Sequence, residues 1–203
     1  MVLKSALRGA AVAASASVGL LVTPELAGSS NFESLPGFVP NPDAFCVGTG
    51  RADSKTHTFY YENVEPVMVT ALNAHRSYMD GSAQVAVKTQ LLASGNSATD
   101  AYIRDQNYTN QCFRAWHGAS GGYIIGLRQC IAINGAGECE RSDIRFDTSF
   151  YPGRSAEEIR SLACHEVGHS LGLMHRAEQC MTETANSAII YSDHDKAHLN
   201  TIN

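Results

Sequence analysis

Five segments between residues 56 and 151 have the composition or the alternation of hydrophobic and polar residues that is typical of β-strands. They are THTFYYE (56–62), AQVAVKTQLL (83–92), DAYIRDQNY (100–108), GGYIIGLRQCIAI (121–133) and SDIRFDTSFY (142–151). Between the first two, residues 66–79 carry Val67, Leu72 and Met79 among good helix formers, and Pro66 suits the first turn of a helix. A helix that leads back into strands predicts a mixed α/β (α+β) sheet rather than a sandwich.

A second helix is predicted after the last strand. Ser155 can cap its first turn, and Glu158, three residues later, completes a capping box. Gly172 is expected to end it, because glycine readily adopts the left-handed conformation found at helix ends. The buried side of this helix is expected to consist of Ile159, Leu162, Ala163 and Leu171.

The length of 203 residues suits one well-buried domain, preceded by a leader. Lys4 and Arg8 come before an apolar run, Gly9 to Val22, that is too short to span a bilayer as a helix. We therefore expect residues 1–30 to be a secretion signal peptide and residues 31–203 to be a secreted, extracellular domain. A core helix at the N-terminus is the alternative. Ser29 stands where a lipoprotein signal needs cysteine, so we expect no membrane anchor.

The charge of the chain disfavours two kinds of partner. Removal of residues 1–30 would change the formal net charge from −5 to about −6, because two basic residues and one acidic residue are lost. No basic face is present to neutralise phosphates, so we expect neither nucleic acid nor an anionic membrane surface as a partner. We expect a monomer.

Six cysteines are present, and an even number in an exported chain favours disulfides, although six cysteines allow 15 pairings. Cys130 and Cys139 flank NGAG, which reads as a hairpin turn, and this favours a bridge between them. A Cys164–Cys180 bridge would bracket the histidine-rich segment described next, and Cys46–Cys112 would remain. Free buried thiols are the alternative.

The segment ACHEVGHSLGLMH, residues 163–175, contains three histidines and one glutamate. His165 and His169 are four residues apart and so lie on one face of a helix, with Cβ atoms roughly 5–6 Å apart. Two imidazoles at this spacing can bind one ion at about 2.0–2.1 Å. A helix that ends at Gly172 lets His175 complete a three-histidine set, which leaves a fourth position open for water. Such an open site is typical of catalytic zinc.

Glu166 is the candidate general base. It follows His165 directly and is expected to face the open side of the metal, where its carboxylate can take a proton from a zinc-bound water. A carboxylate can also return that proton to a leaving amine.

The stretch HEVGHSLGLMH matches the pattern H-E-x-x-H-x-x-G-x-x-H and resembles the zinc signature of the metzincin metallopeptidases. Met181 lies six residues after His175, an interval similar to that of the methionine turn in the matrixin branch. The chain therefore resembles a small, secreted, matrixin-like metzincin over roughly residues 46–203. The resemblance implies a mixed twisted sheet, a long active-site helix and a short C-terminal subdomain.

The resemblance also implies a substrate site. An upper part of the domain would end near Gly172 and a lower part would begin near Leu173, with a protein or peptide substrate in the cleft between them. Residues 121–129 are the candidate for a sheet edge that pairs with substrate, and an ordinary sheet strand is the alternative. The stretch Thr182 to Tyr191 would shape the pocket for the residue after the scissile bond.

The implied activity is that of a secreted zinc endopeptidase, with Zn²⁺ on His165, His169 and His175 and with Glu166 as base. A secreted zinc-binding protein without peptidase turnover is the alternative. A second histidine pair, His194 and His198, lacks a third ligand and is not interpreted as a metal site. For Tyr191 we expect a packing role.

Overall fold

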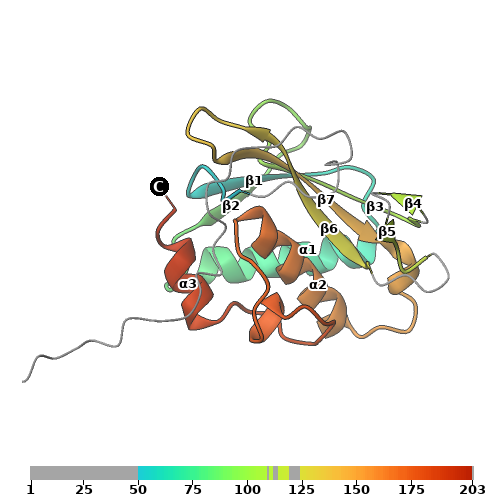
Figure 1. Ribbon diagram of the computed structural model, residues 1–203. Coiled ribbons are helices and arrows are strands. Elements are labelled where there is room, and N and C mark those ends of the chain that lie inside the picture. The colour runs from blue at the N-terminus through green and yellow to red at the C-terminus, as the bar shows by residue number, and fades with distance from the viewer. Residues whose placement is uncertain (1–49, 109, 112–113, 119–123, 203) are drawn as a thin grey trace, which may run out of the picture.

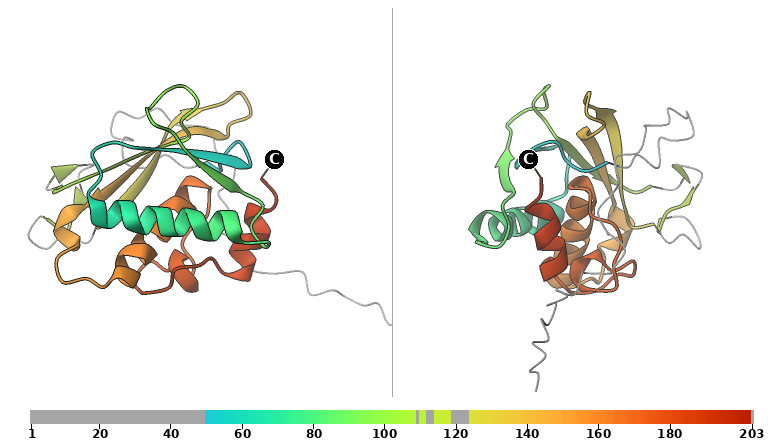
Figure 2. Two further views of the ribbon diagram at one scale, coloured as in Figure 1. Left: turned by 180° about the vertical axis from the view of Figure 1, so that it is seen from behind. Right: turned by 60° about the vertical axis from the view of Figure 1, so that its left-hand side comes forward.

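A five-stranded sheet with two long helices on one of its faces forms the body of the protein in the computed structural model (Figures 1 and 2). The structure describes residues 50–108, 110–111, 114–118 and 124–202. The expected signal peptide and the expected Cys46–Cys112 bridge lie outside these residues. The helices are α1 (Pro66–Gly81), α2 (Ala156–Ser170) and α3 (Asp193–Leu199), with short 3-10 turns η2 (Thr148–Phe150) and η3 (Gln179–Met181).

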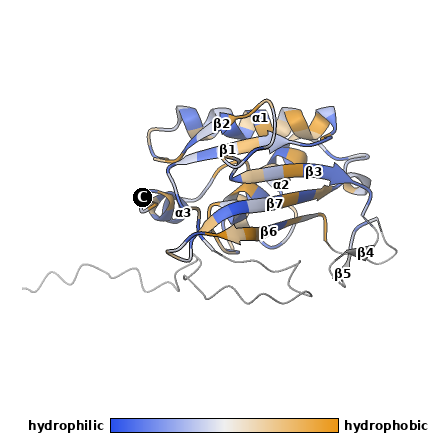
Figure 3. Cartoon of the chain, turned by 90° about the horizontal axis from the view of Figure 1, so that it is seen from above, coloured by the Kyte–Doolittle hydropathy of each residue, from blue (hydrophilic) through white to orange (hydrophobic). Residues whose placement is uncertain are grey.

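The sheet has the strand order β2-β1-β3-β7-β6, which can be followed from above in Figure 3. Its strands are β1 (Thr56–Tyr61), β2 (Lys88–Leu91), β3 (Ala101–Gln106), β6 (Gly126–Ile133) and β7 (Cys139–Asp147). The first four strands in this order run parallel to one another, and β6 is antiparallel to β7. Within the described residues, β6 is therefore an edge of the sheet. A small separate ribbon contains β4 (Asn110–Gln111) and β5 (Arg114–Ala115).

The predicted mixed α/β fold is confirmed, but several strands differ in extent from their predictions. The strand predicted over 83–92 is limited to β2, because the backbone N–H of Ala86 donates to Asn200 Oδ1 instead of to a neighbouring strand. Val85 and Val87 are nevertheless buried, which explains the alternation in the sequence. The strand predicted over 142–151 begins earlier, at Cys139, and ends at Asp147.

The side chain of Asp147 explains that early end. It accepts a hydrogen bond from the backbone N–H of Ser149 and so begins the η2 turn. A short Asp side chain that bonds to the backbone two residues ahead favours a turn over a continuing strand.

Helix α1 begins at Pro66, as predicted, and is held at both ends by groups from other elements. No side chain of its own caps the start; the Asp105 carboxylate on β3 accepts from the backbone N–H of Glu65 at 3.1 Å. At the other end, the Lys88 ammonium donates to backbone carbonyls at 3.0–3.2 Å. These bonds satisfy groups that a helix end leaves without internal partners. They therefore fix α1 against the sheet.

The hydrophobic core fills the space between the sheet and the two long helices. Its fully buried members from the strands include Phe59, Ile103, Ile144 and Phe146, and those from the helices include Met68, Leu72 and Val167. Through this core, α2, which carries the histidine segment, packs against one face of the sheet.

Two buried histidines lie in the core between the sheet and the helices. His57 on β1 shares a hydrogen bond of 2.9 Å with Ser170 Oγ, and His75 on α1 shares one of 2.9 Å with the Tyr191 hydroxyl. Burial lowers the pKa of each ring from 6.5 to about 3, and the charges of Arg128 near His57 and Arg160 near His75 add to the effect. Both rings are therefore neutral in the folded protein at neutral pH.

We expect these histidines to make the fold acid-sensitive. The unfolded chain protonates each of them below about pH 6.5, whereas the folded chain does so only near pH 3, so the free energy of unfolding falls as the pH falls through that window. The expected slope is about 1.4 kcal/mol per pH unit for each histidine. His75→Gln keeps a hydrogen-bonding group for Tyr191 and should flatten the profile by about that amount. Denaturant unfolding of both proteins in chelator, from about pH 6 to pH 4, measures this difference in slope. Parallel plots of the free energy of unfolding against pH would contradict the expectation.

No helix within the described residues is long and apolar enough to cross a membrane.

Candidate metal centre

The sequence around α2 sets both ends of the helix. The Ser155 hydroxyl accepts from the backbone N–H of Glu158, and the Glu158 carboxylate accepts from the backbone N–H of Ser155, so the predicted capping box is confirmed. At the other end, Gly172 has φ +99°. The backbone N–H of Leu173 reaches back to the carbonyl of Gly168 at 2.9 Å. This left-handed glycine ends the helix, as predicted, and turns the chain back.

Gly172 is also required by its neighbour. A Cβ at this position would lie 2.5 Å from the Cα of Arg51, so the turn has no room for a side chain. The chain reverses here within a few residues of His169, and the reversal places His175 opposite the helix.

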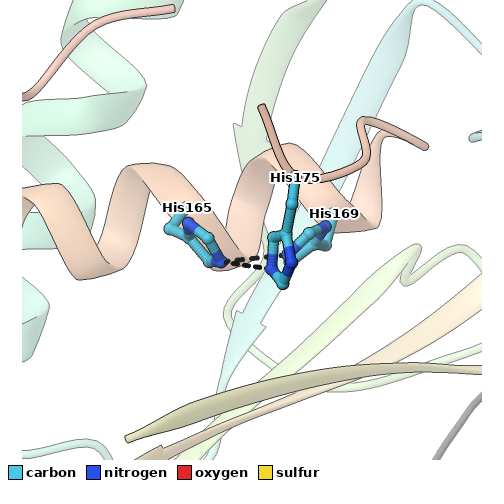
Figure 4. Close-up of side chains that lie close together, drawn as sticks. All are labelled: His165, His169 and His175. Carbon is cyan, nitrogen blue, oxygen red and sulfur yellow. Dashed lines mark hydrogen bonds between the residues drawn. The ribbon is translucent and has the colours of Figure 1, made fainter. Parts of the chain in front are cut away.

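The three histidines converge, as Figure 4 shows. The Nε2 atom of His165 lies 3.0 Å from that of His169 and 3.1 Å from that of His175. One ligand atom from each ring lies within 4.8 Å of the other two, and no other such group occurs in the described part of the chain. Three nitrogens bound to one tetrahedral ion at about 2.0–2.1 Å would lie about 3.3 Å apart. The donor set and its spacing fit zinc.

Two backbone carbonyls orient the rings. Nδ1 of His165 lies 2.8 Å from the carbonyl oxygen of Cys180, and Nδ1 of His169 lies 2.7 Å from that of Leu173. An imidazole that donates its Nδ1–H to a carbonyl presents the Nε2 lone pair to a metal. Each helix histidine is thus fixed in the tautomer that zinc requires.

The charge state of these rings also suits a metal. Burial lowers the pKa of His165 to about 4, and burial together with the neighbouring His165 lowers the pKa of His169 well below its usual value. Neutral imidazoles bind metal and protonated ones do not, so both rings are ready to bind at neutral pH.

Glu166 is buried between α2 and the edge strand β6, with only 4% of its surface exposed. Burial raises the pKa of its carboxyl group to about 8, against a hydrogen bond from the Arg128 backbone and the Arg128 charge, which both lower it. Gly126, at the start of β6, lies directly against this carboxylate, because a Cβ there would collide with Oε1. The candidate base is therefore held by the strand that forms the sheet edge.

Met181 is fully buried in η3. Its sulfur packs against Gly168, where a Cβ would collide with it. Gly168 is next to His169, so the methionine supports the segment that carries the histidines.

Two of the three predicted disulfides are confirmed, Cys130–Cys139 and Cys164–Cys180. The first closes the β6–β7 hairpin. The second joins the residue before His165 to the residue before Met181, and its Cys180 supplies the carbonyl that orients His165.

Loss of the second bridge should lower the stability of the fold. Replacement of both Cys164 and Cys180 by serine opens a loop with a sequence separation of 16 residues, and closing a loop of about 15 residues stabilises a protein by about 3 kcal/mol in the chain-entropy model. Denaturant unfolding of this double variant against wild type measures the change. The matched control replaces Cys130 and Cys139, which are separated by 9 residues. Loss of this shorter loop closure should lower the free energy of unfolding by less. Equal stability of the first variant and wild type would refute the expectation.

The structure also places Tyr191, the His194 and His198 pair and the candidate edge segment. Tyr191 is fully buried, and its hydroxyl donates to the carbonyl of Cys164 at 3.2 Å. The residue therefore lies in the core, in agreement with the expected packing role. His194 and His198 have Nε2 atoms 2.9 Å apart on α3, but no third ligand joins them within the described residues. In the candidate edge segment 121–129, residues 121–123 lie outside the residues that the structure describes, and β6 begins at Gly126.

Several groups that build the site were not found from the sequence. They are Gly126 and the Arg128 backbone, which the sequence placed in a candidate substrate edge but not beside Glu166, and the carbonyls of Leu173 and Cys180 behind the histidines. Backbone carbonyls leave no signature in residue type, and Gly126 stands about 40 positions from Glu166. The packing of β6 against α2 brings it there.

The fold and the site together define a mixed α/β protein with a three-histidine site that fits zinc. No protein-family model matches the chain, and no curated protein matches it. Among solved structures, myroilysin is similar, with 14% identity and a TM-score of 0.37 over 62% of this chain and 52% of that one. Archaemetzincin from Archaeoglobus fulgidus, solved with malonate, has 13% identity and a TM-score of 0.36 over 70% of this chain and 91% of that one. The chain thus spans about half the length of myroilysin.

Proposed function

We propose that the protein is a secreted zinc-dependent endopeptidase of the metzincin type. One observation carries the proposal: three imidazole Nε2 atoms converge at hydrogen-bond distances, and a buried glutamate directly follows the first of them in α2. A purely structural zinc site has four protein ligands, and three are found here within the described residues.

His165, His169 and His175 would hold the metal. When bound, zinc would supply a Lewis acid that activates water and polarises the carbonyl of a peptide bond. The carbonyls of Cys180 and Leu173 keep the two helix rings in the required tautomer.

Glu166 would move the proton. Its carboxylate would accept a proton from the attacking water and return it to the nitrogen of the departing amine. Burial favours the protonated form of this carboxyl group, and the charge of a bound zinc ion would favour the ionised form that accepts the proton.

The substrate would be an extended peptide that pairs with the edge of the sheet. Strand β6 is an edge within the described residues, and it carries Gly126 beside Glu166. Pairing there by strand addition would place a peptide bond next to the carboxylate. The stretch from Thr182 to Tyr191, which follows Met181, would border the pocket for the residue after the scissile bond.

Secretion and the matrixin-like form belong to the proposal as well. The basic and apolar pattern of residues 1–30 supports export, and the two disulfides fit an oxidising compartment. The six-residue interval from His175 to Met181 supports the matrixin-like branch.

The test is hydrolysis of casein or gelatin with and without a chelator. We expect cleavage at internal peptide bonds, loss of cleavage in the chelator and recovery when zinc is restored. A protein that binds zinc but cleaves neither substrate would instead be the zinc-binding protein without turnover.

A further inference from the structure

The segment that follows Met181 is an irregular loop, residues 182–190, without helix or strand. Its two ends meet, because the backbone N–H of Cys180 donates to the carbonyl of Ile190 at 3.3 Å. The shape of such a loop depends on side-chain bonds, since its backbone has no regular ladder.

One side chain, Asn186, makes most of these bonds. Its Nδ2 donates to the carbonyl of Gln179 at 3.2 Å, to the carbonyl of Thr184 at 3.4 Å and to the Thr182 hydroxyl. Its Oδ1 accepts from the backbone N–H of Ala188 at 2.6 Å. Asn186 thus joins the beginning, the middle and the end of the loop.

The same side chain fixes the loop to the active-site helix. Asn186 Oδ1 also accepts from the Ser161 hydroxyl at 2.8 Å. Ser161 lies four residues before His165 in α2, so the two side chains share one face of the helix about 5–6 Å apart. The loop is therefore anchored one helical turn from a candidate metal ligand.

The bonds require an amide. The carbonyl oxygen of Asn186 accepts from Ser161 and Ala188 while its NH₂ group donates to carbonyls. An ionised aspartate accepts hydrogen bonds but donates none. Asp at this position would keep the bonds to Ser161 and Ala188 and would face the carbonyls of Gln179 and Thr184 with a negative charge.

We propose that Asn186 is a positioning residue for substrate selectivity: it sets the shape of the 182–190 loop and anchors that loop beside His165, and so determines which side chain the enzyme accepts after the scissile bond. This inference rests on the proposed peptidase function. Asn186 has no contact with the three histidines in the structure, so its effect should fall on selectivity and not on metal binding.

The experiment compares Asn186→Ala, Asn186→Asp and Ser161→Ala with wild type. The matched control is Asn200→Ala, because the Asn200 amide also braces a loop, through the backbone of Gln84 and Ala86, but at the end of α3. Each protein is measured for zinc content, for thermal stability, for kcat and KM on one peptide, and for the distribution of cleavage sites in a peptide library. Hydrogen exchange of residues 179–190 reports loop order without any need for activity.

We expect both Asn186 variants to keep zinc, to exchange faster in the loop and to change their preference at the position after the scissile bond by about 10-fold, the scale on which pocket shape discriminates between similar side chains. Ser161→Ala should shift the preference in the same direction by less, and Asn200→Ala should not shift it. Asn186 variants that lose stability like the control but keep the wild-type cleavage distribution would overturn the proposal. A wild-type protein that cleaves no peptide would overturn the proposed function and the selectivity role together, and the exchange data would still show whether Asn186 orders the loop.

Discussion

Glu166→Gln should lower kcat for peptide hydrolysis by about 10²–10⁴-fold, the usual contribution of general acid–base catalysis. The amide is nearly the same size as the carboxyl group, so it fits beside Gly126 and can still accept from the Arg128 backbone. It cannot take a proton from water. Because Glu166 is not one of the three converging ligands, the variant should still bind one zinc per chain. The measurements are the hydrolysis rate of a peptide and the zinc content of the same sample.

Glu157→Gln is the control for this change. It alters an exposed glutamate in the first turn of the same helix and should leave both zinc content and hydrolysis at the wild-type values. A Glu166→Gln protein that cleaves peptide at close to the wild-type rate would show that another group is the base.

His169→Ala should abolish metal binding and hydrolysis together. His169 supplies one of three nitrogen ligands and is held in position by the carbonyl of Leu173. Two remaining imidazoles would leave the ion half coordinated, and zinc should be lost on dialysis against a weak chelator. The hydrolysis rate should fall to that of wild-type protein in chelator, and added zinc should not restore it at the concentration that restores wild type.

The control here is His117→Ala, since His117 is an exposed histidine outside the cluster. Full zinc content in His169→Ala would contradict the three-histidine site, whatever the activity. The Glu166 and His169 variants therefore test the proposed proton transfer and the proposed metal binding separately.

Helix α2, which carries His165 and His169, was the part of the fold that the sequence predicted best. Its start at Ser155, its capping box and its end at Gly172 all follow from interactions between residues at most five positions apart. The convergence of His165 and His169 is set by the same helical spacing. Local chemistry of this kind can be read from sequence because its partners are close along the chain.

The parts that the sequence did not predict depend on contacts between distant residues. Val85 and Val87 alternate like strand residues and are buried, but Asn200 from the C-terminal end takes the backbone N–H between them. The carbonyls behind the histidines and the strand that covers Glu166 come from other segments in the same way. Residue type alone does not predict such contacts between distant segments.

The most direct test of the central claim is to assay zinc and peptide cleavage in one preparation of the wild-type protein. The protein is purified to a constant metal content, and the products of a peptide library are identified by mass spectrometry with and without chelator. We expect one zinc per chain and new termini at internal peptide bonds, which disappear in chelator and return with zinc. One zinc per chain without any new termini would contradict this expectation and would identify the site as a metal-binding site without turnover.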